Sequence, residues 1–344
     1  MSPAMLRLPA SFRPLAAGAC IALALAACGH RDLSAVDPAG PQAGRIAAMT
    51  WYLTIVGSAV FVVTVGFLLY ALWRGHRRVE NYSGEAADRH IHRWIQGAVA
   101  VTTLILLVTL IYNFTTGRAL ASFAEPDALV IRVTGHQWWW QAQYIDPVPS
   151  NRIETANEIH IPVGRRVRIE VQAADVIHSF WVPNLHGKVD LIPGYTNTTY
   201  FRADRAGVYH GRCAEFCGLQ HAKMDFLVIA DPPAQFAAWY RNQLRSAAAP
   251  ADSVRQAGQQ VFLSTRCAMC HAIRGTEAGS RVGPDLTHLA SRITIASGVL
   301  PNTRGPLAGW VLDPQAIKPG VYMPPNQLKT DELHALLSYL QSLK

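Results

Sequence analysis

The chain carries little charge for its size. Asp, Glu, Lys and Arg make up 16% of its 344 residues, against about 25% in soluble globular proteins, whereas half of the residues are hydrophobic. The formal net charge is +8, but the sequence has no long run of lysine and arginine and no nucleic-acid recognition motif. Arginines instead flank long apolar segments, as basic residues do beside membrane spans. The composition therefore predicts a membrane protein with globular parts and no nucleic-acid partner.

Cysteine is also scarce, and its placement argues against a disulfide framework. An even number of cysteines outside the cytoplasm first suggests disulfides. Four of the six, however, lie in two closely spaced clusters typical of metal or haem binding, and the other two fall in or at the end of an N-terminal targeting segment. We expect no disulfide in the mature, loaded protein. The six are Cys20, Cys28, Cys213, Cys217, Cys267 and Cys270.

Residues 1–28 have the features of a secretory signal. Arg7 and Arg13 precede a short apolar stretch, PLAAGACIALALAA, which is too short to span a bilayer. The stretch ends in LAAC, which resembles the cleavage box of bacterial lipoproteins, so we expect Cys28 to become the lipidated first residue. Cleavage at a nearby site without lipidation, or an uncleaved anchor, are the alternatives.

Two long apolar runs predict a transmembrane hairpin over residues 45–115. Residues 46–73 and 94–114 contain no charged side chain and are long enough to cross a membrane as helices. The loop between them, 74–93, carries five arginines, which places it in the cytoplasm. Both globular ends of the chain then lie outside. Residues 29–44, before the first run, are polar with Gly and Pro and are expected to form a flexible linker.

The remaining chain divides into an all-β and an all-α domain. Residues 124–232 contain short β-rich runs separated by turn residues, the pattern of a sandwich or barrel. Residues 234–250 predict a helix that runs into a linker. Residues 251–344 show apolar positions at helical spacing. The predicted fold class is a multidomain membrane protein with a two-helix hairpin, an all-β domain and an all-α domain.

The segment CAEFCGLQHAKM, residues 213–224, gathers ligands for a soft metal. Thiolates and thioethers suit soft metals, and imidazole suits copper and zinc. The single cysteine pair has the wrong spacing for a zinc ribbon. Blue-copper sites combine cysteine, histidine and methionine, and VIHSFWVP supplies a histidine, His178, from a distant strand.

These segments resemble subunit II of the haem-copper cytochrome c oxidases. The matching pieces are the hairpin, GHQWWW, HSFWVP, KVDLIPGYTN and CAEFCGLQHAKM, which follow the family's order over residues 45–232. The resemblance implies that residues 124–232 form a cupredoxin domain with two copper ions. In this reading Cys213 and Cys217 bridge the coppers and His178 and His221 each bind one. Met224 and the backbone carbonyl of Glu215 are then weaker ligands.

The resemblance also implies roles for neighbouring residues. Electrons would enter through the aromatic run Trp138, Trp139 and Trp140. The side chain of Glu215 would lie at a magnesium site shared with the catalytic subunit. The loop with Lys188 and Asp190 would face that subunit. One feature departs from the family: HIHRW, residues 90–94, has no glutamate at the expected start of the second helix.

CAMCH, residues 267–271, is the attachment signature of a c-type haem. Cys267 and Cys270 would form thioethers, and His271 would bind the iron. Met323 in VYMPP is the expected sixth ligand, with His288 and His334 as rivals; His/Met ligation suits electron transfer. Residues 251–344 are thus predicted to be a cytochrome c domain. Arg274 is either a partner of a haem propionate or a surface charge.

Together these features predict an electron-transfer subunit of a bacterial terminal oxidase that couples oxygen reduction to proton translocation. The expected partners are the catalytic subunit I, other oxidase subunits, membrane lipid, and cytochrome c or another periplasmic donor. The expected location is the inner (plasma) membrane, with the copper and haem domains on the periplasmic side. Two alternatives remain: the same module in a nitric oxide reductase, and a copper carrier or assembly protein.

Overall fold

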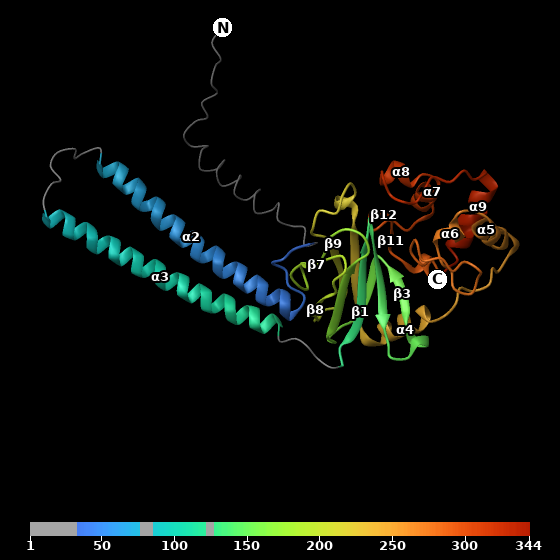
Figure 1. Ribbon diagram of the computed structural model, residues 1–344, viewed down its shortest axis with the longest axis horizontal. Coiled ribbons are helices and arrows are strands. Elements are labelled where there is room, and N and C mark those ends of the chain that lie inside the picture. Colours follow the sequence, from blue (N-terminus) through green and yellow to red (C-terminus); the bar gives the residue numbers. More distant parts are fainter. Residues whose placement is uncertain (1–32, 76–84, 122–126) are drawn as a thin grey trace, which may run out of the picture.

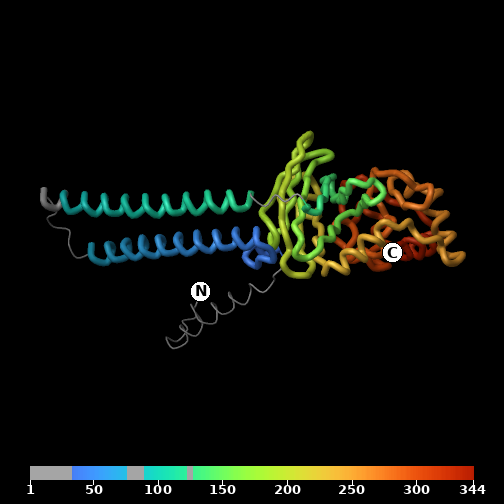
Figure 2. The backbone as a smooth tube through the Cα atoms, turned by 90° about the horizontal axis from the view of Figure 1, so that it is seen from below, coloured from blue at the N-terminus to red at the C-terminus, as the bar shows by residue number. Residues whose placement is uncertain are grey.

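The computed structural model describes residues 33–75, 85–121 and 127–344. The predicted signal peptide, Cys28 and residues 76–84 of the arginine-rich loop lie outside the described residues. In the described part, a pair of long helices is followed by a β domain and then by a helical domain (Figures 1 and 2). The expected fold class is therefore confirmed.

The helices α2 (Pro41–Gly75) and α3 (Glu85–Ala121) lie side by side as a hairpin (Figures 1 and 2). Both are long and apolar enough to cross a membrane, and the most apolar stretch of each helix is not buried by the rest of the chain. The rings of Tyr52 and Tyr112 pack edge-on, with their centroids 5.1 Å apart. The hydroxyl of Tyr52 lies 3.0 Å from Oγ1 of Thr109. The chain enters and leaves the hairpin at the end beside the β domain, as an outside–inside–outside path requires.

Both helices extend beyond the apolar runs, and this corrects two expectations. The linker expected over residues 29–44 is wrong at its end, because α2 begins at Pro41 and its first turn packs on the β domain. Ala39 and Ala43 are buried there, and their amides donate to the carbonyls of Asn184 (2.7 Å) and Leu185 (3.2 Å). Helix α3 starts at Glu85, so a glutamate does stand at the start of the second helix.

The β domain is a sandwich of two five-stranded sheets. One sheet has the order β3-β2-β1-β5-β8 and the other β4-β10-β9-β6-β7. Alternate residues are buried in strands such as β2 and β5, as expected when one sheet face packs on the core. The strands are β1 (Leu129–His136), β2 (Trp139–Ile145), β3 (Ile153–Ala156), β4 (Glu158–Pro162), β5 (Val167–Ala173), β6 (His178–Trp181), β7 (Val189–Leu191), β8 (Asn197–Phe201), β9 (Gly207–Cys213) and β10 (Asp225–Asp231).

The C-terminal domain is built on the crossing of its first and last long helices. A side chain at Gly258 in α5 would come within 2.1 Å of the carbonyl oxygen of Ala335 in α9, so only glycine permits this approach. The helices here are α4 (Pro233–Gln243), which packs on the sandwich, and α5 (Ser253–Ser264), α6 (Cys267–Cys270), α7 (Arg304–Leu312), α8 (Pro314–Ile317) and α9 (Thr330–Leu340). A short hairpin is formed by β11 (Thr294–Ile295) and β12 (Leu300–Pro301).

Candidate metal and haem sites

The first candidate site lies in the loop between β9 and β10, residues 213–224, which we call the cysteine loop. Cys213 ends β9, and its amide donates to the carbonyl of Met224, immediately before β10, at 3.0 Å. The amide of Ala214 donates to Ser179 in β6, the strand that begins with His178. The distant histidine is therefore brought to the loop by pairing between neighbouring strands of one sheet.

Sulfur and nitrogen donors converge inside this loop. The Sγ atoms of Cys213 and Cys217 are 3.8 Å apart. Nδ1 of His178 lies 3.9 Å from the Sγ atom of Cys213. The ligand atoms of these three residues all lie within 4.8 Å of one another, and their side chains are buried. On the other side, Sγ of Cys217 lies 3.7 Å from both Nδ1 of His221 and Sδ of Met224.

Glu215 contributes two different groups. Its backbone carbonyl faces inward, 3.2 Å from Sγ of Cys213. Its carboxylate is half exposed and lies 3.7 Å from Nζ of Lys188. The residues singled out around the cysteine loop are thus close together, and a buried set of soft donors of this kind fits copper.

The electrostatics of the loop favour a thiolate. The neighbouring Cys217 thiol lowers the pKa of Cys213 to about 3, with help from His178 and backbone amides. The same proximity and burial raise the pKa of Cys217, because two adjacent thiolates repel. Burial lowers the pKa of His178, but Cys213 and Asp175 more than offset it, so the net shift is upward. A metal bridging both sulfurs would have to displace the second proton.

Neighbouring groups hold the donors in place. Oδ1 of Asp175 lies 2.8 Å from Nε2 of His178, which leaves Nδ1 facing the cysteines. Gly135 in β1 makes room for that ring, since a Cβ there would be 2.8 Å from its Cδ2. The indole of Trp138 donates to the carbonyl of Cys217 at 3.0 Å, and that of Trp140 donates to the carbonyl of Met224 at 3.3 Å. A carboxylate partner such as Asp175 fixes the tautomer and orientation of a ligand histidine.

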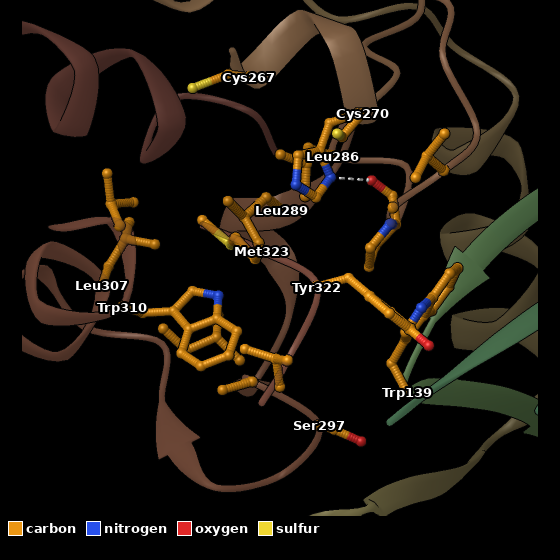
Figure 3. A pocket seen from close by; sticks show the side chains of 18 of the residues that line it. Trp139, Cys267, Cys270, Leu286, Leu289, Ser297, Leu307, Trp310, Tyr322 and Met323 are labelled. Carbon is orange, nitrogen blue, oxygen red and sulfur yellow. Dashed lines mark hydrogen bonds between the residues drawn. The ribbon is translucent and has the colours of Figure 1, made fainter. Parts of the chain in front are cut away.

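The second candidate site is a cavity of about 510 Å³ in the C-terminal domain. Cys267, Cys270 and His271 line it. Met323 points into the same space (Figure 3). The other lining residues are largely apolar, among them Leu286, Leu289, Leu307 and Trp310. A large apolar cavity with CxxCH on its wall and methionine inside fits a c-type haem.

His271 is set up as a ligand. Its Nδ1 lies 2.7 Å from the carbonyl oxygen of Pro284, so Nδ1 carries the proton and Nε2 is left as the acceptor. Burial lowers the pKa of His271, which favours the neutral ring that a metal requires; the Pro284 carbonyl opposes this shift.

Of the three predicted candidates for the sixth position, only Met323 lines the cavity. Both ring nitrogens of His288 instead face backbone carbonyls, those of Lys344 and Arg245. Arg274 does not reach the cavity either, because its guanidinium donates to the carbonyls of Gln243 and Leu244.

Comparison with known proteins gives the same division of the chain. Residues 129–230 match the family model of the periplasmic domain of cytochrome c oxidase subunit II, and residues 256–344 match that of cytochrome c. Cytochrome c oxidase subunit 2 of Alkalihalophilus pseudofirmus is 36% identical over 350 residues, which cover 98% of this chain and 96% of that protein.

The chain belongs to the cytochrome c oxidase subunit II family. The subunit 2 of Bacillus subtilis is 29% identical over 350 residues, covering 95% of this chain and 96% of that protein. A crystal structure of the periplasmic domain of subunit II from Bradyrhizobium japonicum is 34% identical and covers 34% of this chain and 95% of that chain, with a TM-score of 0.32. The protein is therefore an oxidoreductase subunit of haem-copper oxidase type, with an attached cytochrome c domain.

In this subunit II the two candidate sites adjoin one another. The haem cavity is lined from the β domain by Trp138 and by Trp139 (Figure 3), whereas Trp140 is fully buried in the sandwich core. Three cationic residues that the sequence did not single out also line the cavity: Arg266, Arg292 and Lys318. No sequence motif marks these residues, and their position on the cavity wall is known only from the structure, in which the two domains are in contact.

Proposed function

We propose that this subunit passes electrons from a c-type haem to a binuclear copper centre and on to an oxygen-reducing subunit I, coupled to proton translocation. The observation that carries the proposal is the adjacency of the two sites. The residue whose indole donates to Cys217, Trp138, also lines the haem cavity. When bound, the two cofactors would supply one-electron redox chemistry.

The cysteine loop would hold two copper ions. Cys213 and Cys217 would hold both ions through their thiolates, and His178, His221 and Met224 would supply the other side-chain ligands. The carbonyl of Glu215 would complete the set. A rigid sandwich that fixes these donors supports rapid electron transfer, because little has to move when the charge changes.

The C-terminal domain would hold one covalently bound haem. Cys267 and Cys270 would form the thioethers, and His271 and Met323 would bind the iron. Arg292 lines the cavity and is a candidate partner for a haem propionate, in place of Arg274. Trp138 and Trp139 would form the path by which electrons enter the copper domain, while Trp140 would support the cysteine loop.

The assembly would lie in the bacterial inner membrane with both redox domains in the periplasm. The hairpin and the lipidated Cys28 would contact lipid and other oxidase subunits. The carboxylate of Glu215, beside Lys188, would share a magnesium ion with subunit I, and Asp190 would face that subunit. Glu85 begins α3 and would serve as the entry of a proton path into that subunit, since HIHRW has no glutamate. Cytochrome c or another periplasmic protein would donate electrons.

Gas uptake by the complex purified from its native membrane tests the proposal against its nearest rival. Electrons would be supplied through a small reduced dye. We expect rapid oxygen consumption that cyanide inhibits. Consumption of nitric oxide with negligible oxygen uptake would contradict the oxidase assignment and support a nitric oxide reductase. A copper carrier would consume neither gas.

A further inference from the structure

Lys318 is a buried lysine at the contact between the two redox domains. Its side chain is 1% exposed, and Nζ donates to the carbonyl oxygens of Trp138 at 2.9 Å and Ala296 at 3.2 Å. No ion pair with a carboxylate is found for it among the described residues. Burying an amino group this way costs free energy that an apolar side chain of the same length would not. Stability alone therefore does not explain a lysine here.

The place of Lys318 in the chain suggests its role. It follows α8 and begins the short segment, residues 318–323, that leads to Met323. On the other domain, Trp138 accepts from Lys318 through its carbonyl and donates to Cys217 through its indole. One side chain thus joins the segment that carries the proposed haem ligand to the residue that contacts the proposed copper ligand.

Other hydrogen bonds hold this segment, and Ile317 just before it, against the β domain. Gln220 Nε2 donates to the carbonyl of Pro319 at 2.6 Å, and Lys223 Nζ donates to that of Ile317 at 2.5 Å. The hydroxyl of Tyr322 donates to Oε1 of Gln137 at 3.3 Å. Residues 317–322 are therefore attached both to the cysteine loop and to the Gln137–Trp138 turn.

A separate part of the contact prevents rotation about this attachment. Glu158 at the start of β4 is 2% exposed, and its Oε1 accepts from the amides of Ile293 at 2.7 Å and Thr294 at 2.9 Å. Attachment at two places fixes an orientation, whereas attachment at one place does not.

We propose that Lys318 is a positioning residue that docks the cytochrome c domain on the copper domain in one fixed orientation. The covalent link between the domains is then reinforced by a built contact, so the haem cavity stays beside Trp138 between turnovers. The inference rests on the proposed function for its consequence, electron transfer between the two cofactors. The docking itself does not depend on it.

The test compares Lys318→Met with Lys329→Met, a matched change at an exposed lysine of the same domain, in the purified complex. Hydrogen exchange is read at the amides of Ile293 and Thr294, which donate to Glu158 across the domain contact and not to a partner of Lys318. We expect exchange to rise at least about tenfold in Lys318→Met, with amides inside α9 unchanged. Lys329→Met should match the wild type.

The second readout is the rate of electron transfer between haem and copper after a light-activated reductant in solution donates one electron to the haem. We expect at least about a tenfold fall in Lys318→Met with both absorption spectra intact, because a small displacement of reacting groups costs this much or more. Unchanged exchange would overturn the docking role of Lys318, and changed exchange with an unchanged rate would overturn its stated consequence for electron transfer. Absence of transfer in the wild type would instead contradict the proposed function, and the exchange result would still decide the docking.

Wild-type protein provides a test that needs no folded variant. An amine-reactive reagent should modify Lys318 at least about a hundredfold more slowly than Lys329, since docking shields its amino group. Equal rates of modification at the two lysines would overturn the proposal even if Lys318→Met does not fold.

Discussion

At the scale of single residues, Cys217 is the point on which the copper site depends. Its Sγ lies within 3.8 Å of three other donors, on Cys213, His221 and Met224. Its backbone carbonyl also accepts a hydrogen bond from the indole of Trp138. Removing this sulfur would take away the contact that links the two halves of the donor set.

Cys217→Ser should therefore lower the copper affinity of the complex by at least about a hundredfold, more than the loss of an outer-shell partner would. Haem content should be unchanged. The reciprocal control is Cys267→Ser, which should weaken haem attachment and leave copper in place. Metal analysis and the haem absorption of both purified variants check the prediction. Equal loss of both cofactors in either variant would mean that the fold, and not the ligand, had been disturbed.

A second prediction at this scale concerns pH. Burial lowers the pKa of Lys318 from its ordinary value of 10.5 to about 7, while Asp225 opposes the shift. Between these values the unfolded lysine binds a proton that the folded one does not, so stability rises as pH increases from about 7 to 10. Below about pH 7 the penalty is fully present.

Thermal melting at a series of pH values checks this prediction. The midpoint of the wild type, minus that of Lys318→Met, should increase between pH 7 and pH 9.5. The difference removes titrations that both proteins share. A difference that stays constant over this range would show that Lys318 does not titrate there.

At the scale of elements, the crossing of α5 and α9 organises the cytochrome c domain. Gly258 lies where α5 approaches the backbone of α9, and a Cβ there would be 2.1 Å from an α9 carbonyl oxygen. Backbone cannot move aside as a flexible side chain can, so the two helices would have to separate.

Gly258→Ala should destabilise the cytochrome c domain by about 3 kcal/mol, at the upper end of the cost of overpacking a core. Gly279→Ala is the matched control, because nothing lies within 4 Å of the added Cβ and the position is exposed. Denaturant unfolding followed by haem absorption measures the difference. Equal stability of the two variants would contradict the predicted helix contact.

The elements also show what the sequence could and could not predict. Hairpin, sandwich and helical domain follow from apolar length and periodicity, and the cysteine loop and CAMCH follow from local spacing. The start of α2 was missed because its first turn is stabilised by tertiary contacts, at Ala39 and Ala43, and not by apolar character. Lys318 and Glu158 look like ordinary surface charges until the two domains are placed together.

At the scale of the whole molecule, the hairpin sets the side of the membrane on which the redox domains lie. Its two helices return the chain to the end beside the β domain, and the last turn of α2 and the first turn of α3, which flank the arginine-rich loop in the sequence, lie at the other end. The positive-inside rule then places the loop in the cytoplasm.

A membrane-impermeant thiol reagent tests this topology in cells with a permeabilised outer layer. Lys329→Cys, in the cytochrome c domain, should be labelled in intact cells. Arg89→Cys, near the start of α3, should be labelled only after the membrane is broken. Labelling of both residues in intact cells, or of Arg89→Cys alone, would contradict the predicted orientation.

The central claim is that electrons pass within this chain from the haem domain to the copper domain. Light-pulse reduction of the haem in the purified complex, followed at the haem and copper absorption bands together, tests it most directly. The account predicts that the haem band decays and the copper band changes at one common rate, independent of protein concentration. A reduced haem that persists while the copper band stays constant, or a rate that rises with concentration, would contradict it.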